Sequence, residues 1–123
     1  MATFGAFFPY ATISLPISYT GTPGGSNTLN QIVPSDEIWI VSPNMKTSFS
    51  GFTTNNYDYS CSNGTDTASI SMVEGSGFLI PVPNNLSHIV VNSGGTLTYT
   101  ISRGSYGYPV YADFTVIKYK RSL

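Results

Sequence analysis

The chain has 123 residues, of which 41% are hydrophobic, 14% aromatic and only 9% charged. Ordinary soluble domains carry about 25% charged residues. Five bases and six acids give a net charge of -1, which excludes disorder driven by charge repulsion and a general basic surface for nucleic acid. No run of about 18 apolar residues is present, so we expect no membrane-spanning helix. The length is that of a single domain.

Composition favours strands over helices. Val, Ile, Thr, Tyr, Phe and Trp make up 49 of the residues, and these branched and aromatic side chains suit a pleated surface. Ser, Thr, Asn and Gly together make up 52 residues, with Thr counted in both sets, and they keep a surface hydrated without charge. No window shows the apolar spacing of an amphipathic helix. We therefore predict an all-β protein.

The first 35 residues carry no charged side chain. Four aromatic residues near the start, Phe4, Phe7, Phe8 and Tyr10, predict an N-terminal aromatic arm over residues 1–12, followed by one β-sandwich domain over residues 13–123. No Lys or Arg precedes an apolar run here, so the chain lacks the secretory-signal pattern and we expect synthesis in a cytoplasm.

The first predicted strand, Ile13–Tyr19, contains Pro16, which cannot donate to a ladder and so indicates an edge position. The continuous apolar run Ile38–Val41 is typical of a strand covered on both faces. Turn residues every 8–12 positions predict an antiparallel β-sandwich or jelly roll of about eight to ten short strands. The other predicted strands are Leu29–Val33, Thr47–Thr54, Tyr57–Cys61, Ala68–Val73, Phe78–Val82, His88–Asn92, Thr96–Ser102 and Val110–Lys120.

Groups able to catalyse a reaction are few. His88 is the single histidine, and no Gly-x-Ser-x-Gly elbow accompanies it, so we favour a histidine that faces solvent or a partner subunit over a catalytic base. Asp36 and Glu37 are adjacent, and neighbours in a strand point to opposite faces, which argues against a paired-carboxylate site. We predict no catalytic residues and no enzyme activity.

Metal and cofactor sites are also not expected. One His and one Cys, Cys61, cannot build a structural zinc site, and a single cysteine cannot form an internal disulfide. The segment 58–66 offers oxygen ligands, but it departs from the EF-hand spacing and reads as a hairpin turn with an Asn63-Gly64 signal. Phosphate-binding glycine motifs are absent.

Two surface features leave alternatives open. The terminal bases Lys118, Lys120 and Arg121 could meet nucleic acid or an acidic neighbour, although charge that protects an exposed edge strand is the favoured interpretation. Tyrosines near the turn at 103–109 could stack on sugar rings or anchor a protein interface; they are Tyr106, Tyr108 and Tyr111.

Three segments carry a resemblance to a known class of protein. The segments are Pro34–Val41, Gly77–Pro81 and Ile89–Tyr99, and together they resemble small virion proteins of tailed bacteriophages. In those proteins an acidic turn introduces a long strand, then a Pro-containing segment and a Ser-Gly-Gly turn follow. The resemblance implies a β-sandwich or jelly roll, often trimeric, that decorates a capsid or forms part of a head fibre or a tail, with no catalytic residues.

From these observations we predict a non-enzymatic capsid decoration or cement module without cofactor. It would bind the major capsid protein or another virion protein as a small homo-oligomer, with a trimer favoured, and it would not bind nucleic acid or membranes. Phe4, Phe7, Phe8 and Tyr10 are the expected contact residues. The main alternative is a carbohydrate- or receptor-binding module that uses the three tyrosines; a hydrolase built on His88 is the least favoured.

Overall fold

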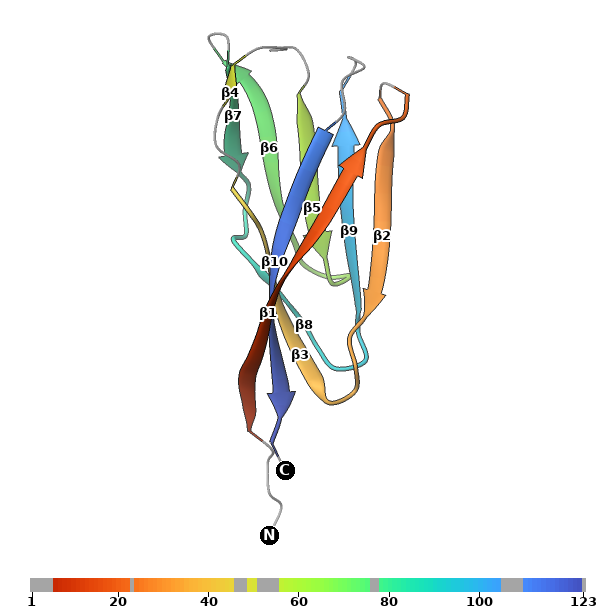
Figure 1. Ribbon diagram of the computed structural model, residues 1–123, viewed down its shortest axis with the longest axis vertical. Coiled ribbons are helices and arrows are strands. Elements are labelled where there is room, and N and C mark those ends of the chain that lie inside the picture. The colour runs from red at the N-terminus through yellow and green to blue at the C-terminus, as the bar shows by residue number, and fades with distance from the viewer. Residues whose placement is uncertain are drawn as a thin grey trace.

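The computed structural model describes residues 6–22, 24–45, 49–50, 56–75, 78–104 and 110–122. These residues form two antiparallel sheets that face one another, so the predicted β-sandwich is confirmed (Figure 1). No helix occurs among them. The ten strands are β1 (Phe7–Tyr19), β2 (Ser26–Ile32), β3 (Glu37–Pro43), β4 (Phe49–Ser50), β5 (Tyr57–Ser62), β6 (Thr67–Gly75), β7 (Phe78–Pro83), β8 (Ile89–Val91), β9 (Thr96–Arg103) and β10 (Val110–Arg121).

The strands pair as one long hairpin rolled up on itself. β1 pairs with β10, β2 with β9, β3 with β8, β4 with β7 and β5 with β6, all antiparallel. Rolling gives a four-stranded sheet in the order β1-β10-β3-β8 and a six-stranded sheet in the order β2-β9-β5-β6-β7-β4. This nested pairing is the jelly-roll arrangement, which viral capsid and lectin domains share.

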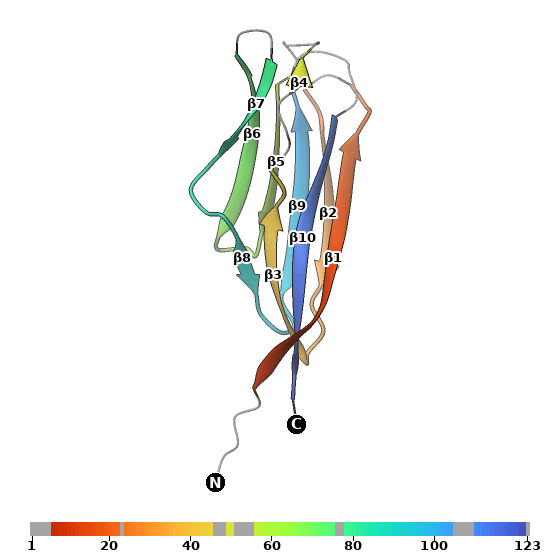
Figure 2. The ribbon, with the colours of Figure 1, turned by 60° about the vertical axis from the view of Figure 1, so that its left-hand side comes forward.

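The ten predicted strand regions correspond to the ten observed strands, with different boundaries. The prediction Thr47–Thr54 overlaps β4, and its other residues lie outside the described part of the chain. β1 begins six residues before the predicted strand, so the second half of the predicted arm pairs with β10, from Phe7 against Arg121 to Thr12 against Ile117, with Tyr10 at a register shift. Figures 1 and 2 show this end of β1 and β10 extending past the second sheet towards both termini.

The core lies between the two sheets and is built by alternate residues of each strand. Its centre is aromatic: the Phe114 ring meets Tyr59 and Tyr99 edge-on, at centroid distances of 6.0 and 5.6 Å. Trp39, predicted to be buried, is 3% exposed. Burial of these rings contributes much of the stability, since each large aromatic side chain removes about 150–250 Å² from water.

The Asn63-Gly64 hairpin predicted from the sequence is confirmed. Gly64 has φ = 94°, a conformation that glycine adopts at no steric cost. Asn63 Oδ1 accepts hydrogen bonds from the backbone N–H groups of Thr65 and Asp66, at 2.9 and 2.7 Å. The Asn63 side chain therefore stabilises the turn by accepting hydrogen bonds from the turn's own backbone.

Candidate functional site

The outer face of the four-stranded sheet is apolar where β8, β3, β10 and β1 lie side by side. Val90 is paired with Ile40, Ile40 with Ile117, and Ile117 with Thr12, in one row across four strands. A second row pairs Ile38 with Tyr119 and Tyr119 with Pro9. We call the following residues the apolar face: Pro9, Ile38, Ile40, Val90, Ile117 and Tyr119.

The apolar face corrects one prediction from the sequence. The run Ile38–Val41 predicted a strand covered on both faces, but the described residues cover only one of its faces. Trp39 and Val41 are buried in the core, whereas Ile38 and Ile40 point outward and stay partly exposed. The described residues therefore do not include the second layer that the pattern predicts.

The outer face of the six-stranded sheet has the opposite chemistry. Over β2, β9, β5 and β6 it presents rows of small polar side chains, which form cross-strand hydrogen bonds such as Thr28–Thr100 at 3.0 Å and Thr98–Asn30 at 2.7 Å. We call this set the hydroxyl face: Ser26, Thr28, Asn30, Asp58, Ser60, Ser62, Thr67, Ser69, Ser71, Thr98, Thr100 and Ser102.

The two faces differ in what they are suited to meet. One carboxylate and eleven uncharged polar residues make the hydroxyl face a surface for water. The six-stranded sheet also has an exposed apolar patch at its far side, over β6 and β7, where Val73 opposes Ile80 and Val82 lies on the same face. The apolar face is broader, because it crosses all four strands of its sheet. Contiguous apolar patches on a protein surface mark sites of interaction.

The expected contact residues do not lie on one surface. Phe7 is opposite Arg121, whose guanidinium lies 5.2 Å from the Phe7 ring, and alternation along β10 places this pair on the side of the apolar face. Phe8, opposite Lys120, and Tyr10 lie on the other side of the sheet. Phe8 and Tyr10 are nearly half exposed, at 46% and 45%. Phe4 lies outside the described residues.

Tyr10 belongs to a compact polar cluster around Glu37 at this end of the sheet. A register shift between Pro9 and Ala11 marks a β-bulge, which turns Tyr10 to the Glu37 side. Glu37 Oε1 accepts hydrogen bonds from the Tyr10 hydroxyl at 2.8 Å and from Trp39 Nε1 at 2.9 Å. Lys118 Nζ lies 4.6 Å from the centroid of the Trp39 ring.

The cluster shifts the pKa of two of its members. Burial alone would raise the pKa of Glu37, but the hydrogen bonds from Trp39 and Tyr10 and the charges of Lys118 and Lys120 outweigh it and lower this pKa. The hydrogen bond to the Glu37 carboxylate is the largest cause that raises the pKa of Tyr10. Glu37 is therefore held as a carboxylate that joins strands, which is a structural task.

Lys118, Lys120 and Arg121 do not lie on an edge strand. Their strand, β10, lies between β1 and β3, so the interpretation that these charges protect an exposed edge is wrong. The three side chains instead lie over aromatic rings: Lys118 over Trp39, Lys120 over Tyr10 and Arg121 over Phe7. Lys120 also lies 3.8 Å from Asp36, and both side chains are about half exposed.

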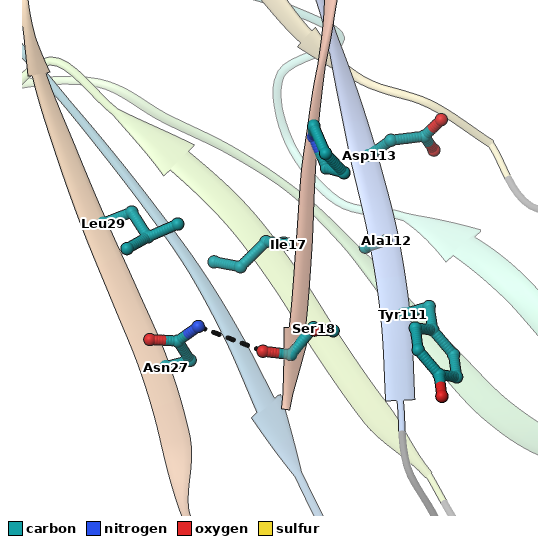
Figure 3. A pocket seen from close by; sticks show the side chains of 8 residues that line it. Ile17, Ser18, Asn27, Leu29, Tyr111, Ala112 and Asp113 are labelled. Carbon is teal, nitrogen blue, oxygen red and sulfur yellow. Dashed lines mark hydrogen bonds between the residues drawn. The ribbon is translucent and has the colours of Figure 1, made fainter. Parts of the chain in front are cut away.

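A groove with a volume of about 430 Å³ lies beside β1, between β2 and β10. Tyr111, one of the three predicted sugar-binding residues, lines it and is 56% exposed. Figure 3 shows Asn27 and Leu29 on one side of β1, and Tyr111 and Asp113 on the other. These groups therefore do not converge on one ligand position. Tyr106 and Tyr108 lie outside the described residues.

The described residues show no arrangement with the geometry of a catalytic or metal site. His88 is exposed beside β8, and its Nδ1 lies 3.1 Å from Oγ of its neighbour Ser87. Asp36 is exposed in a turn while Glu37 is buried, so the two carboxyl groups do not face a common substrate. No group of three or more His, Cys, Asp or Glu side chains comes together in the part of the chain that is described.

The described residues contain no helix that is long and apolar enough to cross a membrane.

No model of a known protein family matches the sequence, and no curated protein matches it. Among solved structures, the chain is similar to the P-domain of Macrobrachium rosenbergii nodavirus. The TM-score is 0.46 and the sequence identity is 15%, over 91% of this chain and 94% of that chain. No function is carried over from this likeness.

Proposed function

We propose that the chain is a non-enzymatic structural module of a virion, a capsid decoration or cement protein that binds the capsid shell as a small homo-oligomer. One observation carries the proposal: a strand with the sequence pattern of a doubly covered strand, Ile38–Val41, has one face that the described residues leave uncovered. A protein of the shell would supply the missing layer. Its location would be the virion, after synthesis in the host cytoplasm.

The mechanism is passive burial of apolar surface. Each Å² of apolar area removed from water contributes about 25 cal/mol before the costs of association. The apolar face has few nearby charges to desolvate: Asp113 lies in the same sheet towards one end and Arg121 towards the other. The hydroxyl face, on the opposite side of the sandwich, would remain towards water and keep the decorated particle hydrated.

The aromatic residues at the start of the chain extend this proposed contact. Phe7 lies on the side of the apolar face, so it is the member of the predicted set that we assign to the shell contact. Phe8 and Tyr10 lie on the reverse side of the projecting end of β1, where a second protein surface could reach them. A projecting two-stranded end with aromatic side chains on both sides suits insertion between neighbouring shell subunits (Figure 2).

The test is co-sedimentation of the purified chain with capsid shells from the same virus, after the shells' own copies of this chain have been removed. Val90→Lys places a charge on the apolar face and is expected to reduce binding at least tenfold. The matched control is Val73→Lys on the other sheet, because both valines are 40% exposed. Equal loss in the two variants, or binding by Val90→Lys at the level of the unaltered chain, would contradict the proposal.

A second candidate function rests on Tyr111. Its ring is exposed beside the groove, and jelly rolls also serve as lectin domains, so a carbohydrate- or receptor-binding module remains the alternative. A glycan array distinguishes the two: saturable binding of a sugar that is lost in Tyr111→Ala supports the alternative. Asn27 lies on one side of β1 and Tyr111 and Asp113 lie on the other, so these groups do not surround one sugar position, and we prefer the structural module.

A further inference from the structure

Four strands form the edges of the two sheets: β1 and β8 in one, β2 and β4 in the other. An edge strand has a row of unpaired backbone N–H and C=O groups, and proteins protect such rows with proline, charge, bulges or short length. β1 contains Pro9, Pro16 and a bulge. β8 has three residues and β4 has two.

β2 has none of these protections. Its seven residues, Ser26–Ile32, contain no proline and no charged side chain, and they pair with β9 without a register shift. The strand beside it, β9, is uncharged until the buried Arg103. A long, regular and uncharged edge is a template for pairing with another strand.

The side of β2 that faces the core is also partly exposed at this edge of the sandwich. Leu29 points inward, opposite the buried Tyr99, yet it is 39% exposed because no further strand covers it. Figure 3 shows Leu29 and Ile17 pointing towards one another at the groove beside β1. At the end of the strand Ile32 is 73% exposed. An additional strand at this edge would cover Leu29 and part of the groove.

We infer that β2 pairs with β2 of a second copy of this chain, antiparallel and about a two-fold axis through Leu29. In this register Leu29 faces its own counterpart, and Thr28 faces Asn30. Asn27 faces Gln31, and Ser26 faces Ile32. Every opposed pair is free of charge, so no like charges meet, whereas like charges directly opposite each other destabilise a sheet. The two Leu29 side chains come together at the inward side, beside Ile17.

A second copy is the occupant that fits, for two reasons. The sequence of β2 is compatible with itself in the antiparallel direction, as the register shows. The other edges of a second copy are protected, so β2 finds an unprotected partner edge in the other copy's β2. A contact between identical patches closes on itself and gives a dimer, not a fibre.

This inference rests on the homo-oligomer part of the proposed function and names the surface that joins the copies. It predicts a dimer, in place of the trimer that the sequence resemblance favours. The two proposals can fail separately. A chain that binds shells as a monomer would overturn the β2 pairing and the homo-oligomer part of the proposed function, but not the shell binding. A dimer that does not bind shells would overturn the shell binding and leave the β2 pairing standing.

The first experiment is sedimentation equilibrium of the purified chain. We expect a mass of twice 13.2 kDa. Thr28→Lys combined with Asn30→Lys would place lysines opposite each other across the axis and weaken the dimer at least tenfold. Ser60→Lys combined with Ser62→Lys is the matched control, on the same outer face in β5 but separated from β2 by β9. A monomer or trimer, or equal weakening by both variants, overturns the inference.

Disulfide trapping tests the register. Directly opposed residues in an antiparallel pair have Cα atoms about 4.5–5.5 Å apart, within the range that a disulfide bridges. Leu29→Cys should therefore form a covalent dimer under mild oxidation. Val73→Cys, which replaces a side chain of almost equal exposure, should not. Cys61 is buried and does not compete. Cross-linking of Leu29→Cys no faster than Val73→Cys overturns the inference.

Discussion

Tyr10 of β1 donates a hydrogen bond of 2.8 Å to Oε1 of Glu37 in β3, although β10 lies between these two strands. The bond therefore reaches across a whole strand, over the side of β10 that carries Lys118 and Lys120. It ties the projecting end of β1 to the body of the sheet. The same carboxylate oxygen also satisfies the buried indole N–H of Trp39.

Replacing Glu37 tests this cluster. Glu37→Leu keeps a similar volume but removes the acceptor, which leaves the buried Trp39 Nε1 without its hydrogen bond. An unsatisfied buried donor costs about 1–3 kcal/mol, so we expect that decrease in the free energy of unfolding in urea. Glu37→Gln keeps an oxygen acceptor and should lose less. A Glu37→Leu variant as stable as the unaltered chain would show that the cluster contributes nothing.

Acid should weaken the fold through the same residue. The folded chain holds the pKa of Glu37 below its ordinary value of 4.5, so in this range the unfolded chain binds more protons than the folded one. The stabilisation is present above about pH 4.5 and is lost as the pH falls through the folded-state pKa. Thermal unfolding measured from neutral pH into acid should show a steeper fall in Tm for the unaltered chain than for Glu37→Gln. Parallel pH curves would contradict this prediction.

The single thiol should be inert in the folded protein. Burial raises the pKa of Cys61 to about 12, against a smaller opposite effect of a backbone hydrogen bond with Ala68, and the residue is fully buried. The thiolate is the reactive form, so Ellman's reagent at pH 8 should not react until denaturant is added. Val73→Cys provides an exposed thiol as a positive control. Rapid reaction of the folded, unaltered chain would show that this part of the core opens.

The centre of the core depends on one phenylalanine. Phe114 has no exposed surface and meets the rings of Tyr59 and Tyr99. Phe114→Ala removes a large buried side chain, which typically costs about 3–5 kcal/mol of unfolding free energy. Phe114→Leu retains much of the volume and should cost less. Urea denaturation measures both, and a loss below about 1 kcal/mol for the alanine variant would contradict the packing described.

Local features of the fold were predictable because they depend on residues close together in the sequence. Alternating apolar residues located the strands, the Asn63-Gly64 pair marked a hairpin, and Pro16 indicated the edge position that β1 occupies. The nested pairing of strands was not predictable in this way, since it joins residues as distant as Phe7 and Arg121.

The polar cluster around Glu37 was not predictable either, because it too joins residues that are distant in the sequence. Nothing in the sequence joins Tyr10 to Glu37, because their contact depends on the register of β1, β10 and β3 and on a bulge at Pro9. The apolar run Ile38–Val41, in contrast, did contain a usable signal. Its pattern called for two covering layers, and the structure supplies one, so the excess hydrophobicity of the strand marks the candidate contact surface.

The most direct test of the account is hydroxyl-radical footprinting of the chain, free and bound to capsid shells. Burial of the apolar face in the particle predicts that oxidation of Ile38, Ile40, Ile117 and Tyr119 falls sharply on binding, while oxidation of Val73 and Ile80 on the other sheet is unchanged. Unchanged oxidation of the apolar face in the bound chain, or protection confined to the six-stranded sheet, would contradict it.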